Sequence, residues 1–199
     1  MNPKIRLIHG IHEREGMSNM GMLLGHLRAA CPLSHASIFQ YGFMGFWAAR
    51  WLNGSVARRL ALATNMASDT GPEVWITHSN GAAIAYLAVK RYGAKPAMII
   101  NINPALDRWR TAGVPRVETI HSRADRVVYW SQWLPFHLWG DQGKVGYRGK
   151  HHNTINHNAS EFSGAMAYDD HTGLFEPERI VQWALFIAQR IGAFTVQRP

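Results

Sequence analysis

The sequence predicts an α/β fold, a three-layer α/β/α sandwich in which about six strands form a mostly parallel sheet. Two features of the chain lead to this fold class. Short apolar runs alternate with segments whose apolar residues recur at helical spacing. The runs are also almost continuously apolar, as in Ala97–Ile102, which is typical of parallel strands buried on both faces.

The strands are predicted from these runs, taken in chain order. Most of them end at a glycine or at a polar residue, where a turn begins. The last run is mostly polar and gives the weakest strand signal. The predicted strands are Lys4–His9, Ala36–Tyr41, Glu73–His78, Ala97–Ile102, Arg116–His121 and Thr154–Asn158.

The helices are predicted from cap and stop residues as well as from spacing. Ser18 can cap the first helix, because a serine hydroxyl accepts a hydrogen bond from the first turn. Asn53 and Gly54 are expected to end one helix and Ser55 to cap the next, while Pro177 suits the start of the last. Residues 122–153 are expected to be irregular. The predicted helices are Ser18–Ala30, Phe43–Leu52, Ser55–Ala67, Asn80–Arg91 and one from Pro177 whose inner stripe is Ile180, Trp183, Ala184, Ile187 and Ile191.

Length and composition predict one globular domain over residues 1–199. Hydrophobic residues make up 47% and charged residues 17% of the 199 positions, an ordinary globular composition. No apolar run approaches the ~18 residues of a membrane span, and the start offers no signal-peptide core. We therefore expect a cytoplasmic protein without a transmembrane segment. Cys31 has no partner for an internal disulfide and is expected to be a small buried residue.

The chain is basic, with a formal net charge of +8. Its arginines and lysines are scattered along the sequence, and no nucleic-acid-binding motif accompanies them. A solvated basic surface is therefore favoured, and no nucleic-acid partner is expected. The alternative, binding to DNA or to lipid headgroups, predicts strong dependence on salt.

The 11 histidines raise the question of a metal site. His151 and His152 are adjacent, a poor spacing for two ligands of one ion, although His157 could join them. A solvated loop is favoured there, and no glycine-rich phosphate loop is present. No metal or cofactor is expected.

The stretch Thr77–Gly81 (THSNG) places a serine between a buried strand and a helix of small residues. A sharp turn there would lift Ser79 above the sheet edge, in front of the free N–H groups of the helix. The stretch resembles the nucleophile elbow G-x-S-x-G of the α/β-hydrolase superfamily, with Thr77 in place of the first glycine.

Two further stretches follow in the order of that superfamily: serine, acid, histidine. Asp125 lies in HSRADRVV after a predicted strand, and His171 lies in YDDHTGLF before the last helix. The resemblance implies that Ser79 is the nucleophile, His171 the base and Asp125 the residue that orients it. Asp107 is the second choice for the acid. Together the matches imply a compact serine esterase or lipase-like member with no cap domain.

The first strand ends in LIHGIH, which resembles the His-Gly motif of the same superfamily. By that resemblance the backbone N–H groups of Ile11 and Asn80 form the oxyanion hole, and Gly10 leaves room for the acyl group. His9 and His12 are candidates for the mouth of the pocket, with packing or surface roles as the alternative.

Aromatic residues follow Asp125 in YWSQWLPFHLW, residues 129–139. Trp130 and Trp133, with Phe43 opposite them, are candidates for the substrate pocket, and residues 129–153 for a lid. The alternative is that these segments pack on the sheet as amphipathic helices. Apolar surroundings suit a small-molecule or lipid-like ester. Thioester or amide hydrolysis, and a non-catalytic binding module, remain open, and the sequence does not indicate an oligomeric state.

Overall fold

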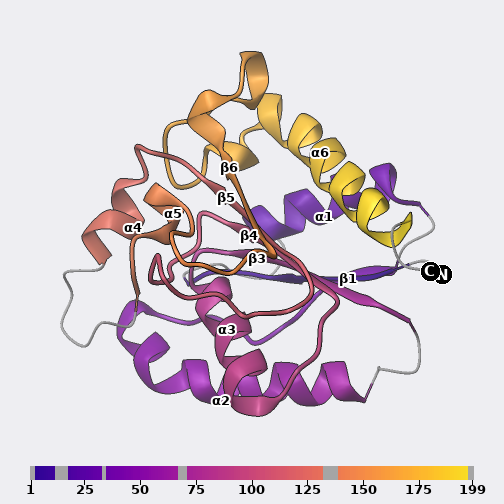
Figure 1. Ribbon diagram of the computed structural model, residues 1–199, viewed down its shortest axis with the longest axis vertical. Helices are drawn as coiled ribbons and strands as arrows, with labels where there is room; N and C mark the ends of the chain where they lie inside the picture. The colour runs from indigo at the N-terminus through magenta and orange to yellow at the C-terminus, as the bar shows by residue number, and fades with distance from the viewer. Residues whose placement is uncertain (1–2, 12–17, 33–34, 67–70, 132–138, 197–199) are drawn as a thin grey trace.

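The computed structural model of the protein describes residues 3–11, 18–32, 35–66, 71–131 and 139–196. Six strands form one sheet in the order β2-β1-β3-β4-β5-β6 (Figure 1). The predicted α/β sandwich is confirmed, and each of these strand pairs is parallel. The strands are β1 Lys4–Ile8, β2 His35–Ile38, β3 Glu73–His78, β4 Met98–Ile102, β5 Val117–His121 and β6 Thr154–Asn158.

Helices cover both faces of the sheet (Figure 1). One core lies between the sheet and the pair α1 and α6, and the other between the sheet and the pair α2 and α3. The apolar stripe predicted for the last helix is buried in the first core. The helices are α1 Asn19–Ala30, α2 Phe46–Asn65, α3 Asn80–Tyr92, α4 Arg126–Ser131, α5 Gln142–Val145 and α6 Pro177–Val196.

The sheet order determines where a site can form. The chain leaves β1 towards β2 on one side and returns to β3 on the other side of β1. Connections that diverge in this way leave a crevice beyond the carboxyl ends of the two strands, the usual ligand site of a parallel α/β sheet. The ends of β1 and β3 are Ile8 and His78, so residues 9–11 and the Ser79 turn flank this crevice.

The prediction of two helices separated at Asn53 and Gly54 is wrong. A single helix, α2, runs through both residues. Asn53 points into the protein and hydrogen-bonds Asn80, which offsets its low helix propensity. The Ser55 hydroxyl donates to the carbonyl of Leu52 within the helix and caps nothing.

Two smaller expectations also need correction. Residues 122–153, expected to be irregular, contain the short helices α4 and α5. Cys31 is only half-buried, at the C-cap of α1. Ser18 caps α1 as predicted, accepting a hydrogen bond from Gly21 N at 2.9 Å. Within the described ranges, no helix has the length and apolarity to cross a membrane.

Candidate active site

Ser79 occupies a strained turn between β3 and α3. Its backbone has φ 52° and ψ −122°, a conformation that residues with a Cβ rarely adopt. Backbone hydrogen bonds to the segment around the end of β4 hold the turn: Ser79 N donates to Ile102 O at 3.1 Å, and Ala105 N donates to Ser79 O at 3.0 Å. Strain of this kind persists where the surrounding structure imposes it and is common at functional sites.

Glycines make room for this turn on the side of β1. A Cβ at Gly81 would lie 2.8 Å from the carbonyl oxygen of His9 and closer still to that of Ile8. A Cβ at Gly10 would lie 3.1 Å from the Cβ of Ser79. The start of α3 is thus packed against the end of the neighbouring strand, and Gly10 borders Ser79 directly.

Thr77, which stands where the elbow pattern has glycine, is fully buried in the sheet. Its hydroxyl donates to Asn101 Oδ1 at 2.7 Å, across to β4. The larger residue therefore fits because a neighbouring strand offers its hydroxyl an acceptor.

Asp125 and His171 are joined by a hydrogen bond of 2.8 Å between Oδ2 and Nδ1. Asp125 is completely buried and lies just before α4, whose Val128 N donates to its other oxygen at 3.0 Å. A carboxylate on Nδ1 holds the ring in one tautomer, with the Nε2 lone pair free to accept a proton.

Asn103, which is not among the predicted site residues, contacts both the acid and the loop that carries His171. Its Nδ2 donates to Asp125 Oδ2 at 3.0 Å and to Asp170 O at 3.2 Å. Its Oδ1 accepts from the Tyr168 hydroxyl at 2.6 Å. Asn103 therefore ties the acid to the loop that carries His171. The only sequence signal is an asparagine just after β4, where a positive φ of 42° favours this residue type.

These contacts set the charge state of the acid. Burial alone would raise the pKa of Asp125, but hydrogen bonds from His171, Val128 N and Asn103 outweigh it, and the pKa lies below the ordinary value of 3.8. Burial next to Asp125 also raises the pKa of Tyr168 well above 10.0, so Tyr168 stays neutral and donates. Asp125 is therefore ionised at neutral pH.

The loop that carries His171 is held against the Ser79 turn by His78. The ring centroids of His78 and His171 are 4.9 Å apart, and His78 Nε2 lies 3.3 Å from His171 O. Asp170 accepts hydrogen bonds from the backbone N–H groups of Thr172 and Gly173, as expected of a loop cap. Ser79 Oγ and His171 are not hydrogen-bonded in the described structure. Such bonds are often long in the absence of substrate.

The two predicted oxyanion-hole residues come from different segments of the chain. Asn80 is the first residue of α3, and Ile11 follows β1 just after Gly10. Neither backbone N–H has an acceptor among the described residues. The Tyr41 hydroxyl donates to the carbonyls of His9 and Gly10 at 2.7 and 2.9 Å, which holds the segment before Ile11.

The Asn80 side chain belongs to a buried network that the sequence did not reveal. Asn53 and Asn80 exchange two amide hydrogen bonds of 2.8 and 2.9 Å. Trp139 Nε1 donates to Asn80 Oδ1 at 2.7 Å. Trp139, the last residue of the aromatic segment 129–139, is thus buried against the start of α3.

Of the other predicted residues, two are exposed, two lie outside the described residues and others pair elsewhere. Phe43 and Trp130 are 57% and 65% exposed, and Trp133 and His12 lie outside the described residues. The Asp107 carboxylate accepts from Trp109 N, not from His171. His157 pairs with Glu118, and no group of metal-ligating side chains occurs in the portion of the chain that is described.

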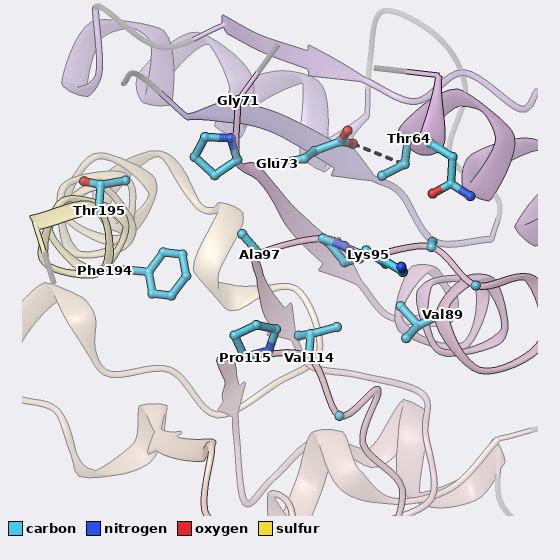
Figure 2. A pocket seen from close by; sticks show the side chains of 16 residues that line it. Thr64, Gly71, Glu73, Val89, Lys95, Ala97, Val114, Pro115, Phe194 and Thr195 are labelled. Carbon is cyan, nitrogen blue, oxygen red and sulfur yellow. Dashed lines mark hydrogen bonds between the residues drawn. The ribbon is translucent and has the colours of Figure 1, made fainter. Parts of the chain in front are cut away.

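A hollow of about 1230 Å³ (Figure 2) lies at the opposite edge of the sheet from this cluster. Glu73, Ala97 and Pro115 line it, and they stand at or just before the amino ends of β3, β4 and β5. A smaller hollow, about 510 Å³, lies where β5 and β6 end and is lined by charged residues such as Lys144 and Arg148. Chemistry, not hollow size, therefore identifies the candidate site.

Comparison with known proteins shows a likeness in structure alone. No protein-family model and no curated protein sequence matches the chain. It is similar to Aspergillus fumigatus lipase B (15% identity, TM-score 0.59), covering 92% of this chain and 52% of the lipase. It is similar to Paleococcus ferrophilus monoacylglycerol lipase (11% identity, TM-score 0.59; 97% and 96% covered). It is also similar to ferulic-acid-bound Est1E from Butyrivibrio proteoclasticus (11% identity, TM-score 0.62; 98% and 89% covered).

Proposed function

Because the chain has the fold of the α/β-hydrolase superfamily, we propose that it is a serine hydrolase that cleaves a carboxylic ester. The observation that carries the proposal is the strained backbone of Ser79, φ 52°, at the carboxyl end of β3. The Asp125–His171 pair supports it, as do the names of two similar structures, lipase B and monoacylglycerol lipase. We treat residues 1–199 as one catalytic domain.

In the proposed reaction, Ser79 Oγ attacks the ester carbonyl carbon while His171 Nε2 accepts its proton. The Ile11 and Asn80 N–H groups donate to the oxyanion, a contribution of roughly 3 kcal/mol per donor. Collapse breaks the C–O bond, and His171 protonates the departing alcohol. Water, deprotonated by His171, then releases the acid from the acyl-enzyme. Asp125 orients the His171 ring throughout. The proposed reaction uses no cofactor.

A panel of p-nitrophenyl esters, from acetyl to palmitoyl, tests this proposal. Ser79→Ala and His171→Ala should abolish turnover, and Asp125→Asn should reduce kcat about 10⁴-fold. Asp107→Asn is the matched control and should keep the parent activity. Labelling of Ser79 by a fluorophosphonate probe, located by mass spectrometry, tests the nucleophile without any assumption about the ester.

The outcomes separate the alternatives. A labelled Ser79 with no ester turnover would direct the search to thioesters and amides, which the same groups can cleave. An unlabelled Ser79 in a folded protein would overturn the proposal and favour a binding module that keeps the turn without the chemistry.

A further inference from the structure

Helix α2 presents an apolar and cationic face to solvent. The helix lies at the outside of its layer, on the side away from the sheet (Figure 1). Trp47 and Trp51 are 68% and 76% exposed, although large aromatic side chains usually bury most of their surface. The α2 outer face, as we define it, consists of Trp47, Trp51, Leu52, Arg58, Arg59 and Leu62, all of them exposed.

The spacings within this face are four residues (Trp47 to Trp51, Arg58 to Leu62) or seven (Trp51 to Arg58, Leu52 to Arg59), so these residues share one side of the helix. Trp47, Trp51, Arg58 and Leu62 form a continuous stripe, while Ala49, Val56 and Leu60 on the opposite side are buried. The inner side is therefore committed to the core. The outer side is an exposed apolar surface of the kind that marks an interaction site.

The charge of this face indicates the kind of partner. The sequence of α2, FWAARWLNGSVARRLALATN, contains three arginines and no aspartate or glutamate. Neither Arg58 nor Arg59 has a carboxylate partner among the described residues. The net charge of the whole chain is +8. A second copy docking through the same face would oppose arginine to arginine, so the charge argues against a symmetric dimer.

We propose that the α2 outer face docks on a bilayer surface that contains anionic lipids. Tryptophan and leucine side chains enter the headgroup boundary of a bilayer, and arginines pair with lipid phosphates. The helix lies along the surface, since its inner side remains packed on the sheet. The inner side of the same helix contacts the residue that follows Ser79, because Asn53 hydrogen-bonds Asn80 at 2.8 Å.

Vesicle sedimentation tests the proposal without any turnover, so its failure is distinct from failure of the proposed function. The parent protein should bind vesicles of phosphatidylcholine mixed with phosphatidylglycerol and bind phosphatidylcholine alone far less. Arg58→Gln/Arg59→Gln should lower the partition coefficient roughly tenfold or more. Trp47→Ser/Trp51→Ser should weaken binding to a comparable degree, because the anchoring aromatic surface is lost.

Two controls keep the test specific. Arg148→Gln/Lys150→Gln removes the same charge from another exposed surface and should leave binding nearly unchanged. Trp109→Ser removes an exposed tryptophan outside α2, with the same expectation. The proposal would be overturned if the parent did not bind the anionic vesicles. It would also be overturned if Arg58→Gln/Arg59→Gln and Arg148→Gln/Lys150→Gln lost binding to the same extent. A dimer that Trp51→Ser dissociates, or tight binding to duplex DNA that Arg58→Gln/Arg59→Gln abolishes, would overturn it as well.

Discussion

Asn53 on α2 and Asn80 at the start of α3 exchange two side-chain amide hydrogen bonds, 2.8 and 2.9 Å long, in a buried environment. The pair connects the middle of one helix to the residue whose backbone N–H is the proposed oxyanion donor. Trp139 closes the network from a third segment. The position of that N–H therefore depends on contacts with segments that are distant in the sequence.

Asn53→Ala should lower kcat while changing KM little, because it loosens a donor that acts on the transition state. The Asn80 amide left without its acceptor should also cost about 1–3 kcal/mol of unfolding free energy. Steady-state kinetics and urea denaturation measure both effects. Asn65→Ala, an exposed asparagine on the same helix, should change neither. Loss of stability with unchanged kcat would leave the pair a structural role only.

Ser79→Gly should abolish hydrolysis and yet stabilise the fold by roughly 1 kcal/mol, because glycine adopts the φ of 52° without strain. Ser79→Ala should abolish hydrolysis without this gain, since alanine keeps the Cβ. Thermal or urea unfolding gives the free energy of unfolding of both variants. The difference between Ser79→Gly and Ser79→Ala measures the backbone strain at this position. If Ser79→Gly were no more stable than Ser79→Ala, the turn would store no strain.

Gly81→Ala should destabilise the protein by roughly 1–3 kcal/mol, because the new methyl group would collide with the main-chain carbonyls of Ile8 and His9. The displacement of α3 should also lower kcat. Gly192→Ala is the matched control: Gly192 also lies in a helix, and a Cβ there meets nothing within 4 Å. That variant should be stabilised by about 0.5–1 kcal/mol. Similar effects of both substitutions would contradict close packing at Gly81.

Glu118→Gln should remove a component of stability that depends on pH. Burial alone would raise the pKa of Glu118, but hydrogen bonds from His157 and Arg190 lower it from 4.5 to about 2. A depressed carboxyl pKa stabilises the fold above pH 4.5, and this contribution is lost as pH falls towards 2. It amounts to about 3 kcal/mol.

Urea unfolding at a series of pH values between neutrality and pH 2 checks this prediction. The parent should lose that contribution on acidification, whereas Glu118→Gln should start less stable and respond less to acid. Glu178→Gln removes an exposed carboxylate from α6 and should follow the parent curve. If the unfolding free energy of Glu118→Gln fell with pH in parallel with that of the parent, the Glu118 carboxylate would not be the titrating group.

The sequence predicted the order of the six strands and of helices α1, α3 and α6 because each has a local signal, whereas the short helices α4 and α5 were not predicted. Short buried runs such as Glu73–His78 indicate strands covered on both faces, and Ser18 marks the point where a helix begins. One local signal misled. Asn53 and Gly54 usually interrupt a helix, but burial of Asn53 against Asn80 outweighed their propensity, and α2 continues.

The sequence by itself determined which segments form the sheet and which residues follow each strand, because periodicity and turn chemistry act between near neighbours. Only the tertiary structure decided which of those residues meet. Asn103 reaches Asp125 and Tyr168 because β4 and β5 are adjacent in the sheet, and Trp139 reaches Asn80 across 59 positions of the chain. Such pairings are fixed by sheet order and by the satisfaction of buried polar groups, and neither is written in the local sequence.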